Sequence, residues 1–308
     1  MSQTTSHILM VRPAHFGFNE ETAASNAFQQ RETALSVADI QKQSKKEFDR
    51  FVKKLQSHGI HVLVANDSVT PVKTDAVFPN NWITTHDDGT LILYPMNAPS
   101  RRAERNEDII GLLEKEFEVK QKIHFDQYEE IGKFLEGTGS MILDRVHKIC
   151  YACLSPRTDL ELLDKFCAAQ HFQRMAFTAV DENGKNIYHT NVMMALAETF
   201  VVICLEAIVK PEERRTLVKQ FEKTRKEIVE ISFSQMNKFA GNMLQVRNDA
   251  DETFLIMSTQ AYESLSKTQV AQIESHTQII HSDISTIEKF GGGSARCMMA
   301  EIFLNKKR

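Results

Sequence analysis

The sequence lacks the features that would place this 308-residue chain outside the ordinary globular class. No apolar run approaches the roughly 20 residues that span a bilayer, so we expect no membrane segment. Residues 1–6 lack a basic region followed by an apolar one, which argues against a secretory signal and favours a cytoplasmic protein. A net charge of -4 offers no basic surplus for binding nucleic acid or an anionic membrane.

Cysteine is scarce, and the five present do not suggest a disulfide scaffold because their number is odd. Cys150 and Cys153 form a C-x-x-C pattern, but they lie in an apolar run, residues 149–154, that is typical of a strand. Residues three apart on a strand point to opposite faces, which makes chelation awkward. We therefore expect these thiols to pack in the core, and we expect no metal and no cofactor, because no other cluster shows ligand spacing.

Proline and glycine are also few, and no linker-like or low-complexity stretch divides the chain. We expect one domain over residues 1–308, although the length would also suit two domains. Three glycines stand together at residues 291–293, shortly before Cys297. Glycine allows positive φ and a close approach of the backbone, so this segment could present the thiol as a nucleophile. The same pattern also fits a flexible loop with an incidental cysteine.

A small polar residue directly before a strand recurs five times, at intervals of 51 to 59 residues. These residues are Asn81, Ser140, Asn191, Asn242 and Cys297. Helical stretches are expected at residues 21–57, 101–115, 158–167, 211–229 and 266–274. The chain is expected to open with strands at 8–11 and 60–65. Such a period indicates a repeat architecture, so we predict an α/β fold of five units, each a hairpin plus a helix, closing around an axis.

Side chains with catalytic chemistry stand at or near the equivalent positions of this repeat. They are Asp75, Asn81, Glu136, His189, Asn191 and Cys297. A cysteine, a histidine and a carboxylate are the parts of thiol catalysis, in which the thiolate attacks a carbon and the histidine moves the proton. Each also has a structural explanation, such as a turn carboxylate, a core histidine or an asparagine that caps backbone. For Asp75, ligand contact and turn capping are equally plausible.

Four segments resemble the guanidino-group-modifying superfamily, also called penteins, which includes arginine deiminases, dimethylargininases, agmatine deiminases and amidinotransferases. They read Asp-Ala-Val-Phe-Pro-Asn-Asn (75–81), Leu-Glu-Gly-Thr-Gly (135–139), His-Thr-Asn (189–191) and Gly-Gly-Gly-Ser-Ala-Arg-Cys (291–297). The chain is most similar to the subgroup called citrulline utilisation hydrolases. The resemblance implies a five-bladed α/β propeller with pseudo-fivefold symmetry. It also implies that Cys297 is the nucleophile, that His189 protonates the leaving amine and activates water, and that Glu136 binds substrate nitrogens.

The chain departs from the arginine-processing members that it resembles. They carry aspartate where this chain has Asn81, commonly aspartate at Asn191, and Glu-Gly-Gly-Asp where residues 136–140 read Glu-Gly-Thr-Gly-Ser. A guanidinium has only donors and is met best by carboxylates, whereas a neutral ureido group also has a carbonyl to which asparagine can donate. The departures favour a ureido substrate such as citrulline, whereas Asp75, as a second carboxylate, keeps arginine open.

An amino-acid substrate also needs a cation for its α-carboxylate. Arg101 resembles the carboxylate binders of the superfamily, as do Arg102 and Arg105, and Arg12 and Arg247 lie near other strand ends. We expect a small-molecule amino-acid ligand, citrulline or arginine-like, and leave a homodimer open. The rival hypotheses are an arginine deiminase or amidinotransferase and, from a different class, a non-catalytic binding protein such as the ribosome anti-association factor.

Overall fold

The computed structural model describes residues 2–23, 26, 28–31 and 35–307. These residues form five separate three-stranded sheets, in the orders β15-β1-β2, β3-β4-β5, β6-β7-β8, β11-β10-β9 and β12-β13-β14. The strands are β1 (His7–Arg12), β2 (His61–Asn66), β3 (Ile83–Thr85), β4 (Thr90–Leu93), β5 (Gln121–His124), β6 (Ile142–Asp144), β7 (Ile149–Cys153), β8 (Gln173–Phe177), β9 (Met194–Leu196), β10 (Phe200–Ile203), β11 (Glu227–Glu230), β12 (Leu244–Arg247), β13 (Thr253–Ser258), β14 (Gln278–Ser282) and β15 (Ala300–Ile302). The fold is therefore mixed α/β with small sheets.

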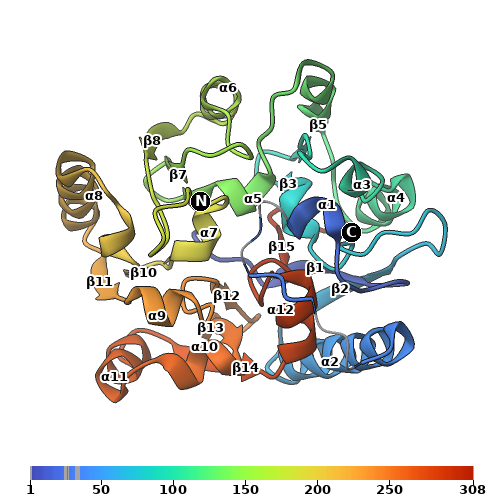
Figure 1. The fold of residues 1–308 in the computed structure, drawn as a ribbon. Helices are drawn as coiled ribbons and strands as arrows, with labels where there is room; N and C mark the ends of the chain where they lie inside the picture. Colours follow the sequence, from blue (N-terminus) through green and yellow to red (C-terminus); the bar gives the residue numbers. More distant parts are fainter. Residues whose placement is uncertain (1, 24–25, 27, 32–34, 308) are drawn as a thin grey trace.

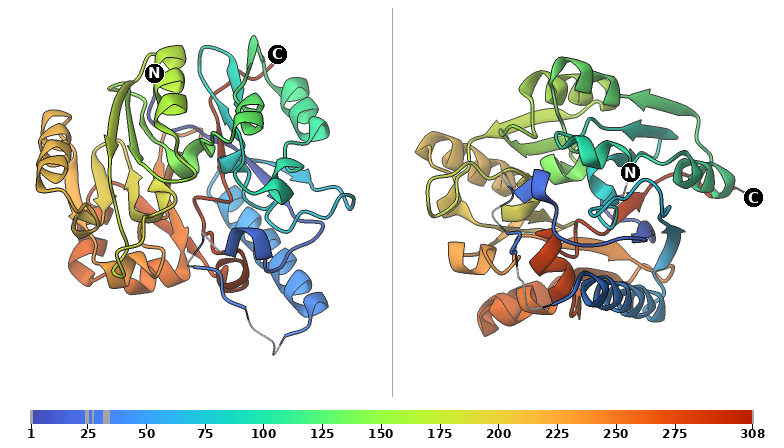
Figure 2. Two further views of the ribbon diagram at one scale, coloured as in Figure 1. Left: turned by 45° about the horizontal axis from the view of Figure 1, so that its top comes forward. Right: turned by 45° about the vertical axis from the view of Figure 1, so that its right-hand side comes forward.

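Helices stand around the outside of the sheets, and short helical turns lie near the middle (Figure 1). Two further views agree with this arrangement (Figure 2). The α-helices are α1 (Glu20–Ala23), α2 (Val37–Ser57), α3 (Pro99–Arg102), α4 (Glu107–Glu116), α5 (Gly137–Ser140), α6 (Leu160–Gln170), α7 (Thr190–Met193), α8 (Pro211–Lys223), α9 (Phe233–Met236), α10 (Thr259–Ser264), α11 (Lys267–Glu274) and α12 (Ser285–Gly291). The 3-10 helices are η1 (Pro79–Asn81), η2 (Asp126–Ile131) and η3 (Leu205–Ala207).

Each sheet contains one antiparallel and one parallel strand pair, so the repeating unit is richer than a hairpin plus a helix. In one unit β9 pairs antiparallel with β10, which then pairs parallel with β11 beyond the helix α8. The predicted helix over 211–229 is wrong in its second part, because α8 ends at Lys223 and β11 begins at Glu227. Arg225 between them has a φ of 54°, the left-handed conformation, which a continuing helix does not adopt.

Two other predicted helices differ from those observed. The stretch 101–115 contains the end of α3 and most of α4, because Asn106 starts a new helix by accepting a hydrogen bond from the Asp108 N–H. The stretch 21–57 contains most of α1 and all of α2, whereas residues 24–25, 27 and 32–34 lie outside the described part of the chain. The predicted helices at 158–167 and 266–274 agree with α6 and α11 within a few residues.

The first and last strands of the chain belong to one sheet. β15 pairs antiparallel with β1, with Leu9 opposite Ala300 and His7 opposite Ile302. β1 also pairs in parallel with β2 over its whole length. The final strand thus completes the unit that the first strand begins, and the segment that carries Cys297 is tied to the start of the chain.

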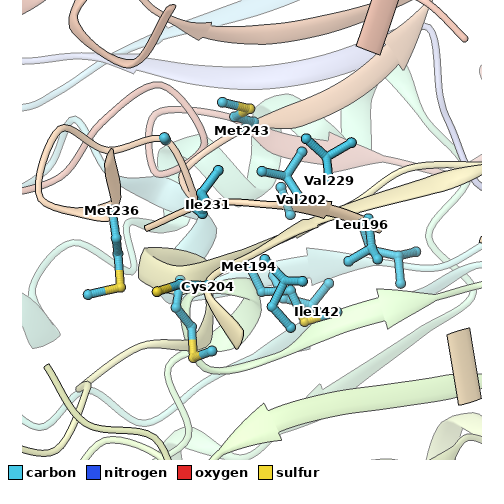
Figure 3. Packing of buried hydrophobic residues seen from close by; sticks show 14 of the residues in the cluster. Ile142, Met194, Leu196, Val202, Cys204, Val229, Ile231, Met236 and Met243 are labelled. Carbon is cyan, nitrogen blue, oxygen red and sulfur yellow. The ribbon is translucent and has the colours of Figure 1, made fainter. Parts of the chain in front are cut away.

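Apolar side chains fill the space between neighbouring sheets. The largest cluster joins the three sheets that contain β7, β10 and β13. Figure 3 shows part of it, with Ile142 from β6, Met194 and Leu196 from β9 and Val202 from β10 facing one another. Because the sheets pack through these side chains, the ends of their strands are held in fixed positions relative to one another.

The C-x-x-C pattern lies in β7, as the sequence predicts. Cys153 packs in the largest apolar cluster and Cys150 in a different one, so the two thiols face opposite sides of the strand. All five cysteines are buried free thiols. Packing therefore explains this pair.

The five residues that precede the strands lie in tight turns. Asn81 ends η1, Ser140 ends α5 and Asn191 lies in α7. The turns at Asn242 and Cys297 are closed by backbone hydrogen bonds of 2.8 Å and 2.9 Å to carbonyls three residues earlier. α5 contacts both η1 and α7, and α5 and α7 lie near the middle of the molecule (Figure 1). Pre-strand positions that are 51 to 59 residues apart in the sequence therefore lie in neighbouring turns of the folded chain.

Candidate active site

The glycine run before Cys297 is closely packed. Helix α12 ends here, and Gly292 has a φ of 62°, the left-handed conformation that often follows a helix end. A Cβ on Gly291 or Gly293 would lie 2.8 Å from ring carbons of Phe78, so only glycine lets the backbone pass this ring. The run therefore fixes the path of the chain toward Cys297, which is buried at 7% exposure.

Two asparagine side chains donate hydrogen bonds to the sulfur of Cys297. Asn191 Nδ2 lies 3.4 Å from Sγ and Asn242 Nδ2 lies 3.3 Å from it. Both asparagines occupy pre-strand positions of the repeat, one in α7 and one before β12. An N–H donor interacts more strongly with a charged acceptor than with a neutral one, so these surroundings suit a thiolate.

His189 and Glu136 form a buried pair next to the same cavity. His189 Nε2 lies 2.8 Å from Glu136 Oε2, and Arg157 Nη1 lies 3.4 Å from that oxygen. Burial lowers the pKa of His189 to about 4 although Glu136 opposes the shift, so the imidazole is neutral near pH 7. Burial alone would raise the pKa of Glu136, but Arg157 and His189 outweigh it and hold that pKa far below its usual range. The pair therefore consists of a carboxylate that orients a neutral imidazole.

Arg101 binds the groups on the opposite wall. Its Nε and Nη2 atoms each lie 2.8 Å from an oxygen of Glu104, its Nη1 lies 2.9 Å from Asn81 Oδ1, and its Nε lies 3.7 Å from Asp75 Oδ2. Burial raises the pKa of Glu104 to about 7 and raises the pKa of Asp75, in both cases against the nearby charge of Arg101. This wall thus holds one permanent cation between two carboxyl groups.

The two walls enclose one small cavity of about 20 Å³. It is lined by Thr22, Asn26, Asp75, Phe78, Asn81, Arg101, Arg157, Tyr188, His189, residues 291–293 and Cys297. Three buried polar atoms of the site have no hydrogen-bond partner among the described residues, namely Asp75 Oδ1, Asn81 Nδ2 and Asn191 Oδ1. Buried polar groups normally find partners, so these atoms are candidates for contacts with a ligand.

The structure brings together the seven residues for which the sequence predicts a catalytic or substrate-binding role. Five of them line the cavity, namely Asp75, Asn81, Arg101, His189 and Cys297. Glu136 reaches it through His189, and Asn191 through the sulfur of Cys297. Their roles in catalysis and binding stay predictions.

Sequence reasoning missed three buried residues of this site. Glu104 and Arg157 pair with predicted site residues, and Asn242 contacts the sulfur. Only Asn242 carried a signal, because it occupies a pre-strand position of the repeat. Neither Glu104 nor Arg157 lies in one of the recognised segments, so their contribution became visible only from the fold.

The other arginines considered for a carboxylate ligand have different partners. Arg102 and Arg105 approach Glu129 at 3.4 Å and 2.6 Å. Arg12 and Arg247 pair with aspartates elsewhere, at 2.7 Å and 3.0 Å. None of the four lines the cavity that contains Cys297.

Within the described part of the chain, no group of three or more His, Cys, Asp and Glu side chains could hold a metal ion. No helix of these residues is long and apolar enough to cross a membrane.

The fold matches solved structures at low sequence identity. The apo structure of ArgZ, an arginine dihydrolase from the ornithine-ammonia cycle in cyanobacteria, gives a TM-score of 0.71 at 17% identity, over 96% of this chain and 40% of that one. The N-terminal domain of ArgZ, as a cysteine-to-serine mutant bound to substrate, gives the same score over 97% of this chain and 99% of that one. A dimethylarginine dimethylaminohydrolase, in an adduct with S-methyl-L-thiocitrulline, gives 0.64 at 15% identity, over 97% and 100%.

These likenesses concern the fold, and the chain spans about 40% of the full length of ArgZ. These structures share the mixed α/β fold of this chain. Residues 12–304 match the model of the family described as N,N dimethylarginine dimethylhydrolase, eukaryotic, and the chain belongs to that family. A comparison with curated proteins found no match.

Proposed function

We propose that this protein is a cysteine hydrolase that cleaves a C–N bond in the ureido group of a small amino acid. Citrulline fits best, and its products would be ornithine, ammonia and carbon dioxide. The observation that carries the proposal is the charge of the cavity. Two buried carboxyl groups beside the cavity are already paired with buried arginines, Glu136 with Arg157 at 3.4 Å and Glu104 with Arg101 at 2.8 Å.

This charge balance favours a neutral reacting group. Asp75 adds a further carboxyl near Arg101, but burial raises its pKa, and the pKa of Glu104 is about 7. The cavity therefore has little surplus negative charge with which to pair a guanidinium. Burying a cation without a partner costs several kcal/mol, whereas a ureido group carries no net charge.

The unpartnered atoms of the site support the same substrate class. Asn81 Nδ2 is a donor, and Asn191 Oδ1 and Asp75 Oδ1 are acceptors. A ureido group presents one carbonyl acceptor and several N–H donors, so it could use all three atoms. A guanidinium has no acceptor for Asn81. The Arg101 bond to Asn81 Oδ1, at 2.9 Å, fixes which end of this amide is the donor.

The proposed reaction needs only the residues of the cavity. His189 takes the thiol proton of Cys297, and the thiolate attacks the ureido carbon. His189 then gives that proton to the departing nitrogen, which leaves as ammonia while a carbamoyl thioester stays on sulfur. Water attacks this carbon after giving a proton to His189, the C–S bond breaks, and the proton returns to the thiolate. The released carbamic acid loses carbon dioxide to give the amine.

Two arginines could receive the α-carboxylate of an amino-acid substrate. Arg101 and Arg157 both line the cavity and are 3% and 2% exposed. Buried arginines bind carboxylates strongly because their N–H groups match the geometry of the anion. Arg101 contacts Glu104 through two nitrogens and Arg157 contacts Glu136 at 3.4 Å, so either guanidinium would share its N–H groups between a protein carboxylate and the substrate.

Arginine, or a methylated arginine as in the name of the family, is the alternative substrate. Asp75 Oδ1 favours it, because an unpartnered buried carboxylate oxygen could accept from a guanidinium. Attack on a guanidino carbon would give a thiouronium intermediate and then citrulline. Transfer of the amidino group to an amine instead of water would make the protein an amidinotransferase.

The test is to incubate the purified protein with citrulline, arginine, N,N-dimethylarginine and agmatine in turn, and to follow ammonia and ornithine. We expect equal amounts of ammonia and ornithine from citrulline. Turnover of arginine without turnover of citrulline would refute the ureido proposal. Cys297→Ser should abolish whichever activity is seen, whereas Cys204→Ser, in the apolar core away from the cavity, should keep it.

We also propose that the five sheets are the blades of a closed pseudo-fivefold propeller that forms one domain over residues 1–308. The pairing of β15 with β1 supports closure, because the last strand completes the first unit. The common strand order of the five sheets supports the pseudo-symmetry.

A further inference from the structure

Asn242 is held in one orientation behind the sulfur of Cys297. Its Oδ1 accepts a hydrogen bond of 3.0 Å from the Arg296 N–H. Its Nδ2 donates to the Asn191 carbonyl oxygen at 3.0 Å and to Cys297 Sγ at 3.3 Å. A backbone N–H only donates and a backbone carbonyl only accepts, so these two partners determine which end of the amide faces the sulfur.

The backbone around Asn242 is built for this close approach. A Cβ on Gly241 would collide with the carbonyl oxygen of Val192 and would lie 2.9 Å from the Cα of Met193, both in α7. Only glycine at this position lets the turn before β12 press against α7. Asn242 itself is 2% exposed. Its amide is therefore a fixed, buried donor whose geometry does not depend on a bound substrate.

Asn191 differs from Asn242 in this respect. It also donates to the sulfur, at 3.4 Å, but its Oδ1 has no partner among the described residues. Its amide can therefore contact both the sulfur and a substrate. Asn242 does not line the cavity, so the sulfur is the reacting atom that it contacts.

We propose that Asn242 is a catalytic residue that stabilises the thiolate of Cys297, while Asn191 divides its amide between sulfur and substrate. This inference rests on the proposed function of Cys297 as nucleophile, and it adds a donor from the unit of β12, β13 and β14, which supplies none of the predicted site residues. Loss of one donor to a charged sulfur should shift the pH dependence of thiol reactivity by about one unit toward alkaline pH.

The experiment measures the rate at which iodoacetamide alkylates Cys297 as a function of pH, followed by mass spectrometry of the peptide that contains it. In this reaction the thiolate displaces iodide and a C–S bond forms, so the rate follows the thiolate fraction. The variants are Asn242→Ala and Asn242→Asp. The aspartate keeps an acceptor for the Arg296 N–H but places negative charge beside the sulfur.

We expect the midpoint of the profile to rise by about one pH unit in Asn242→Ala and by more in Asn242→Asp. At a pH below the midpoints of both proteins, citrulline turnover should fall about tenfold in Asn242→Ala, in step with the thiolate fraction. Asn248→Ala is the matched control, since Asn248 binds Glu252 and the His58 carbonyl in a turn of the same sheet. Its removal can lower stability but should leave the midpoint unchanged.

A midpoint that is equal in the wild type and both Asn242 variants would refute the role of Asn242. If Asn242→Ala does not fold, the same result with Asn242→Asp alone refutes it. The outcome is separable from the proposed function, because alkylation needs no substrate. If the midpoint shifts in the Asn242 variants but the wild-type protein turns over none of the four substrates, the result would support the role of Asn242 as a donor to the sulfur. It would at the same time refute the proposed hydrolase function.

Discussion

Replacing Asn81 by aspartate should move the substrate preference from citrulline toward arginine. Asn81 Oδ1 accepts from Arg101 Nη1 at 2.9 Å, and an aspartate would keep this bond. The other atom, now the unpartnered donor Nδ2, would become an oxygen that carries negative charge. The variant therefore changes the group that faces the substrate while leaving the wall of the cavity in place.

The expected magnitudes follow from these contacts. A ureido carbonyl that loses a buried donor and meets an acceptor loses about 2 kcal/mol, which is roughly thirtyfold in kcat/KM. A guanidinium gains a charge-assisted hydrogen bond, but Arg101 shares the new carboxylate, so we expect a gain of only about tenfold. The ratio of the two specificity constants should thus change by roughly 300-fold.

The assay is steady-state release of ammonia from each substrate, with the thermal midpoint of unfolding as a check on the fold. Asn81→Ala is the control, because it removes the donor without adding charge. It should lose activity on citrulline and gain none on arginine. The ratio of kcat/KM for arginine to that for citrulline could instead stay unchanged in Asn81→Asp, or fall. Either result would show that Asn81 does not select the substrate, and it would contradict the argument that a neutral side chain here favours a neutral ureido group.

Three further predictions test other parts of the site. Cys297→Ser should lower turnover by about a thousandfold or more with an unchanged circular dichroism spectrum. Gly139→Ala should reduce kcat/KM by at least about tenfold, because its Cβ would collide with Asn81 Nδ2 and lie 2.9 Å from the His189 ring; unchanged kinetics would contradict the packing. Burial raises the pKa of Glu288 to about 7, so its ionisation destabilises the fold as pH rises from about 4.5 to 7. In denaturant titrations Glu288→Gln should therefore gain up to about 3 kcal/mol over the wild type at pH 8 and nothing at pH 4.

The sequence was sufficient to predict the five units because each one repeats a local pattern, a polar residue before an apolar strand. It predicted β2 at 60–65 but not the third strands of the other four sheets, β5, β8, β11 and β14. β5 (Gln121–His124) has mostly polar, exposed side chains, and β11 (Glu227–Glu230) has an exposed glutamate at each end. Such strands carry little apolar signal, and their pairing partner lies beyond a helix, so a local pattern cannot identify them.

The candidate site was predictable only where chemistry and repeat position coincide. Cys297, His189 and Glu136 satisfy both conditions, and the fold places them around or beside one cavity. Arg157 satisfies neither, because its importance comes from an ion pair with a carboxylate that lies 21 residues earlier in the chain. Whether two such buried polar side chains pair depends on the distance between their turns in the folded protein. A single sequence does not give this distance.

Charge balance connects the departures in the sequence with the contacts in the structure. The resemblance to the superfamily implies that its arginine-processing members carry aspartate at the position of Asn81 and commonly at that of Asn191. With aspartates there, the walls formed around Arg101 and Arg157 would hold two further negative charges, enough to pair with a guanidinium. With asparagines, Glu136 and Glu104 are offset by Arg157 and Arg101, and burial raises the pKa of Asp75, so a neutral group can be buried without an unpaired charge. Under the proposed function, a change of substrate class needs only two side chains and no change of backbone, and the proposed preference for citrulline depends on the amides of Asn81 and Asn191.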